Sequence, residues 1–258
     1  ANLSMLSTSY INRSGGSMTG TPQGTGTYNL NYSGNSFTTS SELTGSGLND
    51  LNVALNSGQT LTLGQTKTIA GNLAVTSGIL DLGSNNLNRA SSGGTLSVSD
   101  GGTLRIGGTN SMPLNYAGHS FTSGSTVEYY GADQTITPET STGYGNLTLS
   151  GTGTKLIAAG AAVTVQSGLT TGDKLTIMSD NVGNNGSLIV RGSTTGKVTY
   201  KRQLNTGPYG DYYYFSSPVV SNSDLNEGTV TTVWSWDETD GVCPVDTGGT
   251  TGLGSCIG

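Results

Sequence analysis

The densest group of side chains able to do chemistry in this 258-residue chain is a short acidic cluster near its C-terminal end. Closely spaced carboxylate oxygens are the ligands that Ca²⁺ prefers. The spacing does not match an EF-hand loop, because Trp236 stands where the first ligand of that loop belongs. The cluster predicts a Ca²⁺ site, with a solvated acidic turn as the alternative, and the chain suggests no other cofactor. The candidate ligands are Asp237, Glu238, Asp240 and Asp246.

Aromatic side chains gather in the same C-terminal stretch. Tyr and Trp combine a large flat apolar ring with a polar group, which suits them to stack against sugars. Alternating aromatics in a strand also pack well inside a β core, and that role is the alternative. The candidate glycan-contacting residues are Tyr212, Tyr214, Trp234 and Trp236.

Acidic residues elsewhere in the chain are sparse. They are candidates for catalysis because many β-helical proteins cleave polysaccharides. Glycoside hydrolysis needs two carboxylates about 5–9.5 Å apart. Asp81 and Glu128 stand at outward positions and can stack on one face, whereas Asp100 and Asp133 have the sequence context of turns. Arg105 is outward next to Glu128, which predicts an ion pair between neighbouring coils. We therefore interpret these acids as solvated surface groups.

His119 is the only histidine of the chain. Residues 30–38 and 114–122 agree at seven of nine positions, and His119 stands where Asn35 stands in the earlier copy. A position that accepts Asn or His is typical of a polar turn. A lone turn histidine gives no basis for a Ser-His-Asp set. The sequence therefore predicts no catalytic residue and no enzymatic activity.

The two cysteines, Cys243 and Cys256, both lie close to the C-terminal end of the sequence. A disulfide between them would suit an oxidising, extracellular setting, and free thiols are the alternative. No run approaches the roughly 18 apolar residues of a membrane span, so no membrane insertion is expected. Because the chain starts at Ala1, we expect that a leader has been removed or that this is a piece of a longer protein.

Charge divides the chain near residue 200. The net charge is −6, with +1 over residues 1–202 and −7 over residues 203–258. This change predicts a domain over residues 1–202, with an N-terminal capping region at 1–50, and an acidic, aromatic-rich β segment over 203–258 that caps it or begins another domain. An acidic chain without clustered positive charge is a poor partner for nucleic acid.

A short apolar motif recurs from about residue 50 to residue 200, in triplets such as Leu73-Ala74-Val75 and Leu104-Arg105-Ile106. Because side chains alternate faces along a strand, each triplet is expected to bury its first and third residues. Triplets that recur at intervals of twenty to twenty-four positions match a coil of three short strands. The sequence echo, the similarity between residues 30–38 and 114–122, would then span about four coils. The pattern predicts an all-β chain built as a right-handed parallel β-helix, with an antiparallel β-sandwich as the alternative.

These repeats resemble the repeat-rich surface and adhesin-like proteins that certain Gram-negative bacteria export by the type IX secretion pathway. The resemblance implies a secreted or cell-surface β-helical module, with no shared catalytic residues and with a C-terminal sorting domain that is not visible before Gly258. The stretches that carry it are Tyr28–Gly34, Ser77–Leu87, Gly94–Val98, Thr126–Gly131, Tyr144–Gly151 and Tyr212–Val219.

The function that we expect is an extracellular structural or adhesin module, a stiff stalk or display scaffold without catalysis. One alternative is a β-helix that binds glycans or degrades polysaccharides. A second alternative is a subunit that assembles into filaments, because uncapped solenoids can stack end to end. The expected partners are accordingly other surface proteins, glycans or further copies of the chain.

Overall fold

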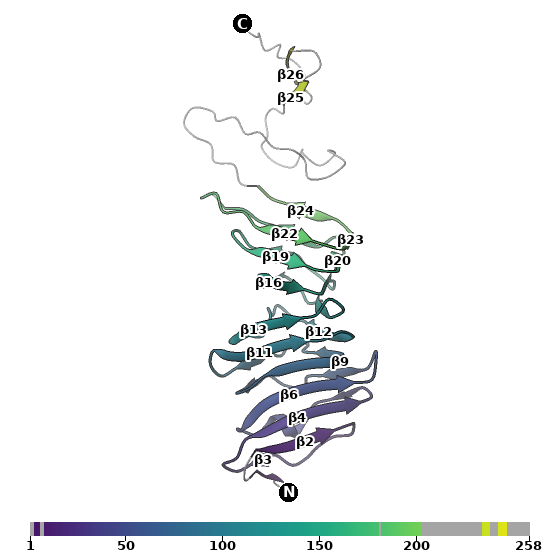
Figure 1. Ribbon diagram of the computed structural model, residues 1–258, viewed down its shortest axis with the longest axis vertical. Helices are drawn as coiled ribbons and strands as arrows, with labels where there is room; N and C mark the ends of the chain where they lie inside the picture. The colour runs from purple at the N-terminus through teal and green to yellow at the C-terminus, as the bar shows by residue number, and fades with distance from the viewer. Residues whose placement is uncertain (1–2, 6–7, 181, 203–233, 238–241, 247–258) are drawn as a thin grey trace. The chain divides into compact units, whose positions relative to one another are not determined.

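The computed structural model describes residues 3–5, 8–180, 182–202, 234–237 and 242–246. The chain divides into two units, Ala1–Asn205 and Thr206–Gly258, and each is described here by itself. The first unit is a stack of about nine coils (Figure 1). In the described part of the chain the only helical element is the 3₁₀ turn η1 (Ser41–Leu43).

Each coil of the first unit passes through three faces in the same order. The first face holds β2 (Ser9–Arg13), β4 (Tyr28–Gly34), β6 (Leu48–Leu55), the start of β9 (Leu73–Asp81), β11 (Gly93–Val98), β13 (Tyr116–Phe121), β16 (Glu139–Tyr144), β19 (Ala162–Val165) and β22 (Ser187–Val190). The second face holds β5 (Phe37–Thr38), β7 (Thr60–Thr62), the end of β9, β12 (Gly102–Ile106), β14 (Thr126–Tyr129), β17 (Asn146–Leu149), β20 (Gly168–Thr170) and β23 (Ser193–Thr195). The third face holds β1 (Leu3–Ser4), β3 (Pro22–Gln23), η1, β8 (Lys67–Ile69), β10 (Leu87–Arg89), β15 (Gln134–Thr135), β18 (Lys155–Ile157), β21 (Leu175–Ile177) and β24 (Val198–Tyr200).

Every pairing between named strands in the described part of the first unit is parallel, and each joins a coil to the next coil. This arrangement confirms the parallel β-helix and excludes the antiparallel sandwich for these residues. Parallel strands need a crossover between them, and the two other faces of the same coil provide it.

One interior column of the first face shows how the coils are in register. Near the N-terminal end Ile11 stacks on Leu30, and near the C-terminal end Val163 stacks on Leu188 across a longer coil, so corner loops of different length are absorbed without loss of stacking. His119 and Glu139 interrupt an otherwise aliphatic series. The column consists of Ile11, Leu30, Leu51, Leu73, Leu96, His119, Glu139, Val163 and Leu188.

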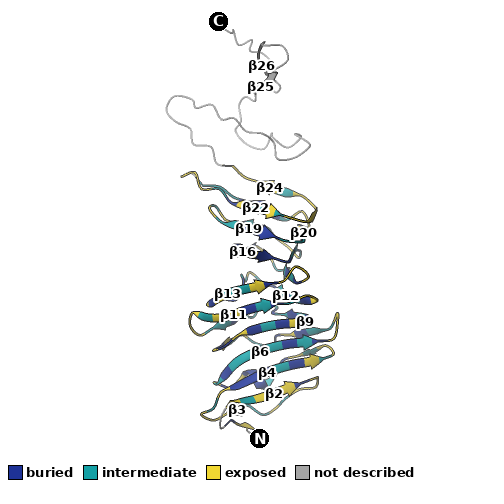
Figure 2. Ribbon diagram, viewed as in Figure 1, coloured by how far each residue is buried: buried dark blue, intermediate teal, exposed yellow. Residues whose placement is uncertain are grey.

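Burial follows the predicted triplets over most of the stack. From Leu61 to Ile177 the first and third residues of each triplet are buried, as Figure 2 shows by the dark bands along the strands. Three residues differ from the prediction. Thr164 and Thr176 are buried although they are middle residues, and Gly143 of the preceding coil lies against Thr164. In the last described coil the expected interior residue Tyr200 is 41% exposed.

Strand β9 serves two faces because it bends at Gly78. Residues before Gly78 pair with β6 and β11, and residues after it pair with β7 and β12. Gly78 has φ of +73°, and a Cβ there would lie 2.6 Å from Cβ of Leu55. Only glycine takes this conformation without strain at such a close approach.

Side-chain oxygens at the corners continue the hydrogen-bond ladder where the strands end. Each accepts the backbone N–H of a residue one coil further along, at N···O distances of 2.6–3.0 Å. Most of these bonds are solvent-exposed, and each links its residue to the next coil. The acceptors are Asn29, Asp50, Asn72, Asn88, Asp100, Asp133, Asn146 and Asp173.

A short amide row runs along the outside of the first face. Asn31 donates from Nδ2 to Oδ1 of Asn12 at 2.8 Å, and Asn52 is next in register. Oδ1 of Asn52 is buried without a hydrogen-bond partner. The row stops there because Ala74 occupies the next position.

We expect Ala74→Asn to extend this row and to raise the free energy of unfolding by about 1 kcal/mol, since its amide would donate to the orphaned Oδ1 of Asn52. Ala74→Asp is the matched control, because an ionised carboxylate has the same shape and no donor. Urea unfolding checks the prediction, and an Asp variant at least as stable as the Asn variant would contradict it.

Two of the three faces are interrupted near the middle of the stack. β13 pairs with β11 but not with β16, and the third face has no described strand between β10 and β15. The two interruptions lie at successive levels: the third-face gap precedes β15, where β11–β13 and β12–β14 still pair, and the first-face gap follows β13, where β14–β17 and β15–β18 still pair. Of the three faces, only the second is continuous through both levels, and side chains bridge each gap.

The echo between 30–38 and 114–122 spans four coils, from β4 to β13, as predicted, but its two copies do not occupy equivalent positions. Tyr32 matches Tyr116 in the echo, but it stacks in register through Val53, Val75 and Val98 to Phe121. The two copies are therefore out of phase, since four coils cover a longer stretch of chain than the offset of the echo. A likeness in sequence here reflects shared corner and strand composition and not a shared place in the coil.

The described part of the second unit is one antiparallel pair, β25 (Trp234–Asp237) and β26 (Val242–Asp246). Trp234 is opposite Asp246, and Asp237 is opposite Val242.

Candidate functional site

The outer row of the second face carries the main charged cluster of the stack. Arg105 is in register with Asp81 of the preceding coil and with Glu128 of the next. Its Nη1 lies 2.9 Å from Oδ2 of Asp81, and its Nε lies 2.7 Å from Oε2 of Glu128. The predicted ion pair between coils is confirmed, and it includes a second carboxylate.

Tyr130 and Ser150 complete this cluster. The Tyr130 hydroxyl donates to Oδ1 of Asp81 at 2.6 Å, and Cζ of Arg105 lies 4.3 Å from the centre of the Tyr130 ring. Ser150 donates to Oε1 of Glu128 at 2.6 Å. Burial, and then the hydrogen bond to Asp81, raise the pKa of Tyr130 to about 12, so it remains a donor at neutral pH. Each carboxylate accepts at least two hydrogen bonds, which indicates a structural role and not that of a free acid or base.

Replacing Arg105 with Gln is expected to lower the free energy of unfolding by about 1 kcal/mol at low salt, because both carboxylates lose their cation while remaining partly solvated. The difference should shrink in 0.5 M salt, which screens exposed charges. Thr148→Ala, in the same row one coil beyond Glu128, is the control and should change stability by less than about 0.5 kcal/mol. A loss that is independent of salt would contradict the ionic origin.

His119 and Glu139 form a second polar pair, inside the first face. His119 lies within β13 and not in a turn, so that part of the prediction was wrong. Nδ1 of His119 and Oε1 of Glu139 are hydrogen-bonded, and the two side chains are 17% and 8% exposed. The pair bridges β13 and β16, which have no ladder between them.

Aromatic groups surround this pair. The Phe121 ring stacks on Tyr144 with 5.5 Å between ring centres, and the His119 ring lies 5.7 Å from Phe121. The Tyr129 and Tyr144 hydroxyls are 3.2 Å apart, and Tyr144 donates to the carbonyl of Thr137 at 2.8 Å. Burial raises the pKa of both tyrosines, so they stay neutral. The sequence signal for this site was the interval from Leu96 to His119, which equals one coil.

Two further polar groups lie inside the coils. Arg13 and Glu42 form an ion pair near the N-terminal end, and Tyr32 donates to Glu42 at 3.1 Å. Lys155 on the third face is fully buried, and its Nζ donates to backbone carbonyls of the corners, including those of Gly131 and Thr152 at 2.8 Å. Burial, and then the charge of Lys174, lower the pKa of Lys155.

Every acid of residues 1–202 accepts a hydrogen bond from a described group. Asp100 and Asp133 lie at corners, as predicted, and serve the corner ladder. Asp180 accepts from the amide of Asn184. The carboxylates are therefore used to connect coils or to shape loops. The nine are Glu42, Asp50, Asp81, Asp100, Glu128, Asp133, Glu139, Asp173 and Asp180.

The residues singled out for Ca²⁺, glycan and disulfide chemistry fall in the second unit. Glu238, Asp240, Tyr212, Tyr214 and Cys256 lie outside the described residues. For the others the structure describes the backbone alone, so all three sites stay predictions. Trp234, Trp236 and Asp237 lie in β25, and Cys243 and Asp246 lie in β26.

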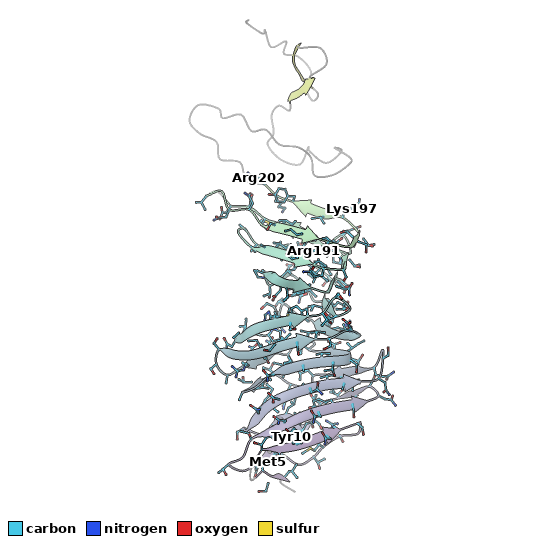
Figure 3. The ribbon with its side chains drawn as sticks, in the orientation of Figure 1. Met5, Tyr10, Arg191, Lys197 and Arg202 are labelled. Carbon is cyan, nitrogen blue, oxygen red and sulfur yellow. The ribbon has the colours of Figure 1, made fainter. Side chains whose placement is uncertain are left out.

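Basic residues gather towards the C-terminal end of the stack. Figure 3 shows Arg191, Lys197 and Arg202 on the last coils, far from Met5 and Tyr10 at the other end. With Lys174 and Lys201 they make up half of the ten basic residues of the chain.

One hollow in the described residues is shallow, with a volume of about 280 Å³, and is lined by uncharged groups: Thr39, Ser40, Ser41, Thr44, Gly64 and Gln65. No cluster of three or more His, Cys, Asp or Glu side chains suited to a metal occurs among the described residues. Among the same residues, no helix has the length and apolar character to span a membrane.

Comparisons with known proteins found no match: no protein family model, no curated protein and no solved structure resembles this chain significantly.

Proposed function

We propose that this chain is a non-catalytic structural module of the cell surface, a stiff β-helical spacer that holds or displays other segments. The fold is consistent with a structural module, because about nine coils are stacked through parallel strand pairing and a largely aliphatic interior. At about 4.8 Å per coil, this stack extends roughly 40 Å along its axis.

One observation carries the proposal. Charged and amide side chains of the coils are used mainly to connect one coil to the next: in the corner ladder, in the Asp81–Arg105–Glu128 row and at Lys155. Groups held this way resist separation of the coils. A catalytic acid or base instead needs access to a substrate.

Secretion to an oxidising surface, by the type IX pathway that the repeats suggest, is part of the same proposal. A more specific version of this proposal is that the module adheres to glycans or to other surface proteins. The proposed glycan contacts belong to the aromatic residues of the second unit, not to the coils.

Force spectroscopy on the full chain, pulled between its ends, tests the spacer. We expect high-force unfolding in several steps, since each coil contacts only its neighbours. A glycan array tests for adhesion, and a reducing-sugar assay on polysaccharides tests for catalysis. Release of reducing sugar would overturn the non-catalytic proposal, and glycan binding without turnover would identify an adhesin.

A further inference from the structure

The first face of the described stack is interrupted between β13 and β16. The same two coils are joined by backbone pairing on the other two faces, through β14–β17 and β15–β18. On the first face the junction is made by the His119–Glu139 bond and by the stacked Phe121 and Tyr144 rings. β16 is also irregular, because its residues 139 and 144 pair with residues 163 and 165 of β19.

This junction places a titratable pair where the same column otherwise holds aliphatic residues. Leu96 on β11 precedes His119, and Val163 on β19 follows Glu139. The other titratable groups that face the pair are the hydroxyls of Tyr129 on β14 and Tyr144 on β16, both neutral. Among the described residues, the charge in this part of the interior therefore rests on His119 and Glu139.

We propose that His119 and Glu139 form a pH-controlled clasp that closes the first face of the solenoid and opens as the imidazole loses its proton. Histidine is the side chain whose charge ordinarily changes between pH 5 and 8. With His119 protonated and Glu139 ionised, the bond is charge-assisted and each buried charge has its partner. When His119 is neutral, the Glu139 carboxylate stays buried without a counter-charge, which is unfavourable.

The second and third faces hold the two coils together when the clasp opens, through β14–β17 and β15–β18. The interior residues of the second face at this level, Leu104, Val127 and Leu147, carry no titratable group. Opening therefore separates β13 from β16 while the coils stay attached. A spacer built this way is stiffer in mildly acidic surroundings than in alkaline ones.

Hydrogen exchange of the full chain tests the clasp, with rates corrected for the intrinsic effect of pH. We expect amides of β13 and β16 to open about fivefold to tenfold more often at pH 8.5 than at pH 6. Amides of β4 and β6, several coils away, should not change. The single histidine also gives one set of imidazole NMR signals, whose titration should follow the same midpoint.

His119→Gln keeps a hydrogen-bond donor without titration and should make β13 and β16 independent of pH. If it does not fold, the double variant His119→Leu/Glu139→Val restores the aliphatic column and should be equally insensitive. Wild-type exchange that is the same at both pH values would overturn the clasp. So would a variant without His119 that keeps the wild-type pH dependence.

Discussion

Glu42→Gln is expected to lower the free energy of unfolding by about 3 kcal/mol, because the loss of one partner of a buried ion pair is strongly destabilising. Glu42 has no solvent exposure, and its carboxylate binds Arg13, accepts from the Ser40 hydroxyl at 2.7 Å and accepts from Tyr32. The neutral amide leaves the Arg13 guanidinium buried without a counter-charge. Chemical denaturation followed by circular dichroism gives the change.

The ion pair between Arg13 and Glu42 also predicts that the protein loses stability in acid. Burial raises the pKa of Glu42, but the hydrogen bonds from Ser40 and the charge of Arg13 outweigh it, so the pKa lies below the ordinary 4.5. The unfolded chain therefore binds this proton more tightly than the fold does. The stability contributed by Glu42 is complete above pH 4.5 and is lost as the pH falls through its lowered pKa.

Arg13→Met/Glu42→Leu is the control, because replacing a buried ion pair by apolar groups is often neutral or stabilising. The double variant should recover most of the stability and lose the acid sensitivity of the N-terminal coils. A Glu42→Gln variant within about 1 kcal/mol of the wild type would contradict a buried, mutually dependent pair.

The stacking of the coils was readable from the sequence, because the physics of strands is local. In Leu73-Ala74-Val75 and Leu104-Arg105-Ile106 a small or charged residue separates two larger aliphatic residues. This alternation identifies the buried side of the strand from the local sequence alone. Gly and Asn residues between the apolar triplets indicate the corners of the coils. The monotonous repeat of the triplets favoured parallel coils, but the same short strands also suit an antiparallel sandwich, so only the structure decides between them.

The register between coils was not readable, and the sites depend on it. Coil length varies, since Ile11 stacks on Leu30 but Val163 stacks on the more distant Leu188, so no fixed offset aligns one coil with the next. His119 was therefore matched to Asn35, when its neighbours in the stack are Leu96 and Glu139. The partner of Arg105 was predicted correctly because Glu128 belongs to the adjacent triplet of the same face.

The corner residues show a second limit. Asp100 and Asp133 were recognised as turn residues from composition, yet their carboxylates also accept the amides of Gly124 and Thr154 in the next coil. A turn propensity describes one residue and its neighbours in sequence. The hydrogen bond depends on which residue stacks above, and that is decided by the length of the whole coil.

Lys155→Met is expected to lower the free energy of unfolding by about 3 kcal/mol, because three backbone carbonyls lose the hydrogen bond from the ammonium at about 1 kcal/mol each. The buried ammonium donates to the backbone carbonyls of Gly131, Ala132 and Thr152. Methionine fills a similar volume but offers no donor. Thermal and urea unfolding, with hydrogen exchange of the corner amides, measure the loss.

The preceding coil supplies the control for this prediction. Gln134 is in register with Lys155 and has the same role with an amide: its Nε2 donates to the carbonyls of Ile106 and Asn110 at 3.1 and 2.8 Å. Lys155→Gln should therefore retain part of the stability that Lys155→Met loses. Leu175→Met, one coil later in the same column, changes shape but no hydrogen bond and should cost less than about 1.5 kcal/mol. If Lys155→Met and Leu175→Met lose the same amount, the ammonium contributes only its volume, and the corners of the coils do not depend on interior donors.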